Sequence, residues 1–263
     1  MRFYYVKFYG GAGGHYIQQL LLWCETQSKQ VVKYENGHAH QHQHYIRFNI
    51  DNIEKSIEHH QLKSTSRYNF LVTAAAAANA RQIKIVYDRD PENFRMINTV
   101  MENPMELALC EYNHFYKNQI FDPEIDYGLL KHYNALKKSQ GIDDPPNPTW
   151  PEVSHEDMAQ VLILKTLEMW EGNWIVGLKR NEEYRALNRI IPNTELSISD
   201  IMNNRDKVLE TVSALVGKPI TPAMQTIARR YVDAQKALQE KFPTFRIMME
   251  TYDQWNPDKA QNQ

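Results

Sequence analysis

The 263-residue chain lacks the features that mark several classes of protein. It holds two cysteines, Cys24 and Cys110, which have no metal-binding spacing and are too few for a disulfide framework. No apolar run approaches the roughly 20 residues of a membrane span, and the chain opens on a strand pattern rather than a signal peptide. The formal net charge is −2, so no global basic field indicates nucleic acid. We therefore expect a cytoplasmic protein without a membrane or nucleic-acid partner.

The composition is that of a folded globular protein. Hydrophobic residues make up 42% of the chain and charged residues 24%, which provides enough apolar material for a core. At ~150 residues per domain, the length allows one large domain or two small ones. We expect one α/β domain over residues 1–263, with residues 102–155 as a helical or loop insertion, or as a cover over the cleft.

The most informative part of the chain is the stretch over residues 3–22, which reads FYYVKFYGGAGGHYIQQLLL. It predicts an apolar strand over 3–8 and an amphipathic helix from about His15. The turn between them holds four of the ten glycines: Gly10, Gly11, Gly13 and Gly14. Glycines let backbone N–H groups approach a ligand, and a helix N-terminus adds donors and the positive end of its dipole. The pattern favours a phosphate-binding loop over its alternative, a tight strand-to-helix turn without a ligand.

This loop departs from the common nucleotide-binding patterns. The phosphate loop of ATPases and GTPases needs Lys-Ser/Thr after its last glycine, where this chain has His15-Tyr16. The dinucleotide pattern G-x-G-x-x-G would need a glycine where this chain has Tyr16. A kinase-like phosphotransferase would also want a magnesium-binding Ser or Thr after the glycines. These departures disfavour all three classes and leave a divergent phosphate loop whose cations come from elsewhere.

Beyond the loop, the sequence alternates between strand and helix patterns. Strands are expected over 68–73 and 82–88, and helices over 74–80 and 92–101. Such alternation predicts a parallel sheet with right-handed crossovers. Further helices are expected in the C-terminal part: 155–170, 205–216 and 222–242.

Arg89 follows the strand expected over 82–88, so it would lie at the carboxyl edge of the sheet beside the glycine loop. Its guanidinium would there hold a second phosphate as a planar fork. The alternative is a surface arginine that pairs with Asp88 or Asp90, an interaction worth little. From the residues alone, the two interpretations stay open.

A run of alternating histidines stands at 38–44: His38, His40, His42 and His44. In an extended segment they would share one face, with neighbours ~6.6 Å apart, and two of them would suffice to share a zinc or copper ion. Nothing nearby supplies an obvious Asp, Glu or Cys ligand, so we expect no metal cofactor and favour a polar loop that lines the cleft. A metal site stays the alternative.

Three motifs give the chain a family resemblance. After the glycine loop come IKIVYDRDP at 83–91 and ELSISDIMNNRDKVLETVSALVGKPI at 195–220. In this order they resemble the sulfotransferase family, and more narrowly the small divergent sulfotransferase-like proteins encoded by tailed bacteriophages. The resemblance implies an α/β, three-layer P-loop-like fold: a central, mainly parallel sheet flanked by helices, with a helical C-terminal part.

The resemblance also implies a nucleotide donor, 3′-phosphoadenosine 5′-phosphosulfate (PAPS). The loop residues would bind its 5′-phosphosulfate: Gly10, Gly11, Ala12, Gly13, Gly14, His15 and Tyr16. Arg89 would take the 3′-phosphate. The family's loop lysine is replaced here by Gly11, and its serine eight residues after the arginine is replaced by Ile97, with Asn98 as the nearest polar residue.

On this resemblance we expect an enzyme that moves a sulfuryl group from PAPS to a hydroxyl-bearing acceptor. Such transfer needs a cation near the leaving phosphate and a base for the acceptor hydroxyl, and His15 or His40 would supply either. The missing loop lysine and serine favour a second hypothesis, in which the fold has lost this chemistry and serves as a binding or virion-associated structural protein. A phage-encoded protein would act in the host cytoplasm, and homo-oligomers and phage-assembly partners stay open.

Overall fold

The computed structural model describes residues 2–27, 70–75, 80–112, 127–143, 153–172, 182–241 and 243–254. The chain divides into two compact units. Unit 1 combines Met1–Glu102 with Val176–Ala234, and unit 2 combines Asn103–Ile175 with Gln235–Gln263. Residues 103–155 of the predicted insertion fall in unit 2, and this unit also includes residues 156–175 and the C-terminal residues from Gln235.

Unit 1 contains a parallel sheet of four described strands, which are β1 (Arg2–Lys7), β2 (Phe70–Ala75), β3 (Phe94–Val100) and β4 (Asn193–Ser197). Their order is β2-β1-β3-β4, and each neighbouring pair is parallel. The chain therefore passes from β1 to the neighbour on one side and then crosses to β3 on the other. The carboxyl ends of β1 and β3 flank this change of direction, which is where open α/β sheets bind ligands.

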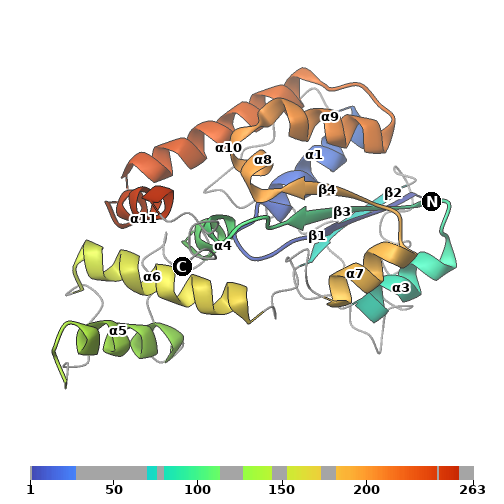
Figure 1. Ribbon diagram of the computed structural model, residues 1–263. Helices are drawn as coiled ribbons and strands as arrows, with labels where there is room; N and C mark the ends of the chain where they lie inside the picture. The colour runs from blue at the N-terminus through green and yellow to red at the C-terminus, as the bar shows by residue number, and fades with distance from the viewer. Residues whose placement is uncertain are drawn as a thin grey trace. The chain divides into compact units, whose positions relative to one another are not determined.

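The helices of unit 1 are α1 (Gly14–Thr26), α3 (Ala80–Arg89), α7 (Glu182–Ile190), α8 (Ile198–Asn203), α9 (Arg205–Val216) and the first part of α10 (Pro222–Lys241). Figure 1 shows α3 and α7 on one side of the sheet and α1, α8 and α9 on the other. Against α3, the apolar side chains of β1 and β3 form one buried cluster that includes Phe3, Tyr5, Phe94 and Met96. The α/β class and the parallel sheet predicted from the sequence are confirmed.

Unit 2 is helical in its described residues, with α4 (Pro104–Glu111), α5 (Tyr127–Ser139), α6 (His155–Glu171) and α11 (Pro243–Gln254). Helix α6 packs against the other three. A largely buried ion pair joins Lys165 of α6 to Glu111 of α4 at 3.0 Å, with the Glu111 side chain only 2% exposed. None of the described helices is long and apolar enough to cross a membrane.

Two adjoining elements differ from the sequence prediction. Residues 82–88, expected as a strand, belong to α3, and residues 94–100, expected within a helix, form β3. Among the α3 residues whose burial is described, Ile83 and Val86 are buried, three positions apart as on one helix face. In β3 the buried Phe94 and Met96 alternate with exposed Arg95. The predicted helix over 74–80 is wrong at residues 74–75, which end β2, and its residues 76–79 lie outside the described part of the chain.

The remaining predicted elements that the structure describes are confirmed within a few residues. They are the strand over 3–8, the helix from His15, the strand over 68–73 in its described residues, and the helices over 155–170, 205–216 and 222–242. Gly217 ends α9 with a φ of 72°, the left-handed conformation that favours glycine. The histidine run at 38–44 lies outside the described residues.

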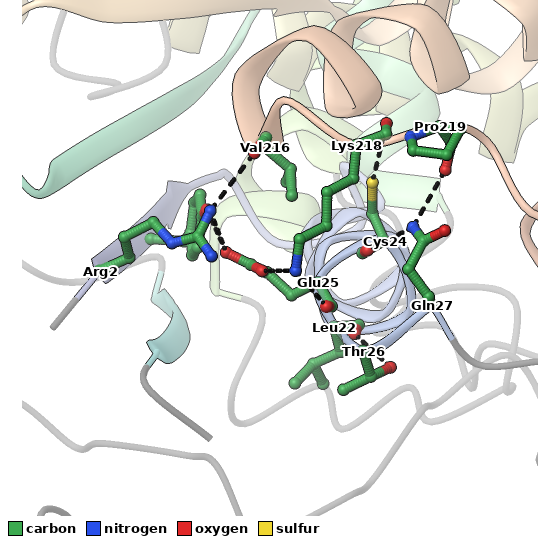
Figure 2. Close-up of polar contacts among 10 residues, drawn as sticks. Arg2, Leu22, Cys24, Glu25, Thr26, Gln27, Val216, Lys218 and Pro219 are labelled. Carbon is green, nitrogen blue, oxygen red and sulfur yellow. Dashed lines mark hydrogen bonds and ion pairs between the residues drawn. The ribbon is translucent and has the colours of Figure 1, made fainter. Parts of the chain in front are cut away.

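A buried carboxylate fixes the C-terminal end of α1. The Glu25 side chain is 1% exposed; its Oε1 accepts a hydrogen bond from the Tyr4 hydroxyl at 2.5 Å and pairs with Arg2 at 3.1 Å. Its Oε2 pairs with the Lys218 Nζ at 2.6 Å, as Figure 2 shows. Burial and the neighbouring carboxylate raise the pKa of Tyr4 well above its usual value, so the hydroxyl stays a donor. These four residues, the Glu25 clamp, join the start of β1, the end of α1 and the segment between α9 and α10.

The segment around Lys218 is held to α1 by backbone acceptors as well. The Cys24 thiol donates to the Lys218 carbonyl at 3.6 Å, and the Gln27 amide donates to the Pro219 carbonyl at 3.1 Å (Figure 2). Burial, followed by the nearby Glu25 charge, raises the pKa of Cys24 to about 11. The thiol is therefore protonated near neutral pH and serves as a donor inside the fold rather than as a nucleophile.

Within unit 2, we expect Asp157→Asn to lower stability by about 1 kcal/mol near neutral pH because Asp157 pairs with Lys137 of α5 at 2.6 Å. Burial by itself raises the pKa of Asp157, but the hydrogen bond and charge of Lys137 outweigh it and hold the pKa below its usual value. The stabilisation is therefore full above the unfolded pKa near 3.9 and is lost as pH falls through the lower native value. Urea denaturation of both proteins should show unfolding midpoints that converge in acid, once the pH lies below the native pKa of Asp157. If the midpoints of the two proteins still differ at that acidic pH, the loss of stability comes from the altered packing of the side chain and not from the loss of its charge.

Candidate functional site

The loop between β1 and α1 lies at the carboxyl edge of the sheet, beside the end of β3. It closes with a hydrogen bond from Ala12 N to Tyr9 O at 3.0 Å, and Gly11 has a φ of 80°. Gly13 precedes α1 with a φ of 72°, and no side chain caps the first turn of this helix. The backbone N–H groups of a helix N-terminus have no acceptors within the helix, so this end of α1 favours an anion.

Side chains of unit 1 pack closely on the two glycines at the start of α1. A Cβ on Gly13 would lie 2.6 Å from the Tyr231 hydroxyl and 2.9 Å from Ile201 Cγ2. A Cβ on Gly14 would overlap the ring of Phe8. These contacts explain both glycines by packing alone, so glycine content at these positions does not distinguish a phosphate loop from a tight turn.

Aromatic rings line the same turn of α1. Tyr16 stacks on Tyr231 of α10, with ring centroids 4.0 Å apart and an interplanar angle of 5°. His15 meets the edge of Phe8 with a centroid distance of 5.3 Å. His15 is half-buried, whereas Tyr16 is buried, so of the two it is His15 that solvent and a ligand can reach.

Lys7 and Asn98 form a polar pair at the ends of β1 and β3, on the side of the sheet that α3 covers. They are register partners in the two strands, and Lys7 is 4% exposed while Asn98 is fully buried. The Asn98 Nδ2 donates to the Oδ1 atoms of Asn188 at 3.0 Å and Asn193 at 2.9 Å. Asn98, which the resemblance assigned to the nucleotide, thus lies at the predicted edge but uses its amide to join β3 to α7 and β4.

Sequence reasoning missed three residues at this edge of the sheet, namely Lys7, Thr99 and Arg205. Lys7 is the one charged residue in the apolar run of the first strand, a signal that was present in the sequence. Arg205 begins α9 and is close enough to Tyr16 for the two to interact electrostatically. The Arg205 guanidinium donates a hydrogen bond to the Asp206 carboxylate, which raises the pKa of Arg205 above its usual value. No local pattern marks Arg205 or Thr99, because only the strand register and the helix packing bring them to the loop.

Arg89 does not lie beside the glycine loop. It is the last residue of α3, and the turn after it leads into the amino end of β3. There the Asn93 carbonyl accepts a hydrogen bond from Phe3 N at 2.8 Å, at the start of β1. Since β1 has six residues that rise ~3.3 Å each, Arg89 and the loop lie at opposite edges of the sheet. The expected position of Arg89 is therefore wrong. In the last turn of α3, its positive charge instead interacts favourably with the negative end of the helix dipole.

The structure brings together one part of the predicted site. Gly10 to Tyr16 form the loop and the first turn of α1, and Asn98 ends up at the same edge, while Arg89 lies at the other. His40 lies outside the described residues. Within the part of the chain that the structure describes, no three His, Cys, Asp or Glu side chains gather in a way that would hold a metal ion.

No protein-family model matches the chain, and a search of curated proteins also gave no match. The resemblance to sulfotransferases therefore rests on the short motifs of the sequence, and the class that the structure defines is an α/β protein with a parallel sheet and a glycine loop at its carboxyl edge.

Proposed function

We propose that this protein has a P-loop-like, three-layer fold of the sulfotransferase type and binds a phosphorylated adenine nucleotide at the β1–α1 loop. The observation that carries this proposal is the place of the loop, at the change of strand direction between β1 and β3 and directly before the N-terminus of α1. The buried Lys7 supports it, because it places a basic side chain at the end of β1, directly before the loop.

The donor that the resemblance implies is PAPS, and its two ends fit this chain unequally. Its 5′-phosphosulfate fits the loop and the start of α1, which offer backbone donors and no carboxylate cap. Its 3′-phosphate does not fit Arg89, which lies at the opposite edge of the sheet. A donor bound here would supply an activated sulfuryl group, and the proposal assigns to the half-buried His15 the role of accepting the proton of the acceptor hydroxyl.

Calorimetric titration with adenosine 3′,5′-bisphosphate, with ATP and GTP in parallel, tests the proposal. We expect binding in the ~micromolar range for the bisphosphate alone. Lys7→Met should weaken it about tenfold because the anion loses a nearby cation. Arg89→Ala, its matched control on the other edge, should bind as the wild type does. Absence of binding by every nucleotide would reject the proposal.

A second function is favoured by the packing around Gly13 and Gly14. Since Tyr231, Ile201 and Phe8 already account for these glycines, the loop also suits a protein that uses the fold for binding or assembly without transfer chemistry. Such a protein would show no nucleotide binding, and its function would then be sought in partner proteins, including those of a virion.

A further inference from the structure

Thr99 is a buried polar residue near the end of β3 for which the fold provides no hydrogen bond. Thr99 is 3% exposed, and its Oγ1 has no hydrogen-bond partner among the described residues. Leaving such a group unsatisfied is unfavourable for folding, so it calls for an explanation.

The strand register places Thr99 on the face of the sheet that α1 covers. Tyr4 and Arg95 are register partners, and the Tyr4 hydroxyl reaches Glu25 of α1, so these positions face α1. Side chains alternate along a strand, so Thr99, four residues after Arg95, faces α1 as well. The paired residues of β1 and β3 end at Lys7 and Asn98. If the same register continued by one residue, Phe8 would lie beside Thr99.

The neighbours of Thr99 on both strands lead to the same two glycines. On one side, the ring of Phe8 lies against Gly14. On the other, Leu196 of β4 is the register partner of Thr99, and α8 begins two residues later. Ile201 of α8 then lies against Gly13. Thr99 therefore pairs with Leu196 on one side and, on the continued register, would neighbour Phe8 on the other, and both neighbours lead to the first turn of α1.

We propose that the Thr99 hydroxyl and the first turn of α1 together form a subsite for a tetrahedral oxyanion, a phosphate or a sulfate group. The hydroxyl donates to an anion oxygen while the helix N-terminus supplies backbone donors and the positive end of its dipole. This inference rests on the proposed function in that it names the part of the nucleotide site that holds the 5′ group. The same subsite is expected to bind inorganic phosphate and sulfate.

Access to the subsite requires one side chain to move, because Thr99 Oγ1 is closed off by its neighbours. Phe8 is half-buried, and its ring covers Gly14 and touches His15. An anion enters as this ring turns outward. Phe8→Leu, with a smaller side chain, therefore binds anions at least as tightly as the wild type does, and weaker binding by it would overturn this route.

Thr99→Val is the decisive variant, since it replaces the hydroxyl by a methyl group of similar shape, and Thr99→Ser is its control that keeps the hydroxyl. Calorimetry and thermal shift are recorded with inorganic phosphate, inorganic sulfate and adenosine 3′,5′-bisphosphate. We expect Thr99→Val to bind each anion about tenfold more weakly and Thr99→Ser to bind nearly as the wild type does. Without ligand, Thr99→Val should melt at or above the wild-type temperature because it removes an unsatisfied buried group.

The outcomes separate this inference from the proposed function. Equal binding by Thr99→Val and wild type would overturn the subsite and leave nucleotide binding in place. If phosphate and sulfate bind in a Thr99-dependent way and the bisphosphate binds no more tightly than they do, the subsite is supported and the proposed nucleotide binding is rejected. No binding of any of the three by the wild type would overturn both.

Discussion

Gly13→Ala is expected to lower the free energy of unfolding by roughly 2 to 4 kcal/mol. The backbone of Gly13 has a φ of 72°, which disfavours any residue with a Cβ. The new Cβ would also lie 2.6 Å from the Tyr231 hydroxyl and 2.9 Å from Ile201 Cγ2, so packed side chains of α10 and α8 have to shift. Urea denaturation followed by far-UV circular dichroism measures the change.

Gly217→Ala is the matched control for this substitution. Gly217 has the same φ of 72°, but its new methyl group would meet no atom within 4 Å beyond its chain neighbours, so only backbone strain of about 1 kcal/mol is expected. Tyr231→Phe in the Gly13→Ala background should recover part of the loss because it removes the atom nearest to the new methyl group. Equal losses for the two glycine variants would show that the packing around Gly13 has no energetic weight.

Glu25→Ala is expected to destabilise the protein by about 3 kcal/mol. The substitution removes the acceptor of a buried tyrosine hydroxyl and leaves Arg2 and Lys218 without their common carboxylate. Removing one partner of a buried charge pair costs more than the pair contributes, because the remaining groups stay desolvated. The same denaturation experiment, with hydrogen exchange of the α1 amides, shows whether the loss is centred on this helix.

The two cationic partners of Glu25 provide the controls. The Arg2 and Lys218 side chains are 41% and 31% exposed, so water replaces much of what they lose, and Arg2→Ala or Lys218→Ala should each cost about 1 kcal/mol or less. Glu25→Gln keeps an oxygen that accepts from Tyr4 and should fall between these values and that of Glu25→Ala. A Glu25→Ala protein as stable as the wild type would show that the Glu25 clamp does not hold α1 in place.

These two variants test the two ends of α1 separately. The Glu25 clamp fixes its C-terminal end to β1 and to the segment around Lys218, while Gly13 and Gly14 allow its N-terminal end to approach α8 and α10. The candidate anion site is at the N-terminal end, so the position of α1 decides where its backbone donors point. The contacts that hold the C-terminal end of α1 therefore also help to fix the position of the candidate anion site at its N-terminal end.

The sequence by itself determined the elements whose signals are local. The strand, glycine turn and helix over residues 3–27 follow from apolar periodicity and from glycines that permit positive φ at Gly11 and Gly13. The helix Arg205–Val216 was predicted with its bounds because an apolar stripe, a terminal glycine and a following proline all agree. The parallel arrangement of the strands followed from their alternation with helices.

Only the tertiary structure decided the types of the elements over residues 80–100. The segment around Ile83 fits both periods: Ile83, Ile85 and Tyr87 alternate as in a strand, while Ile83 and Val86 share a helix face. The choice is made by pairing, since Phe94–Val100 lies between β1 and β4 and fills the sheet, which leaves Ile83 and Val86 to cover its face. With that choice Arg89 lies at the amino edge rather than the carboxyl edge, and Thr99 lies in β3 as the register partner of Leu196. Both positions depend on the register between strands distant in sequence, which no local pattern encodes.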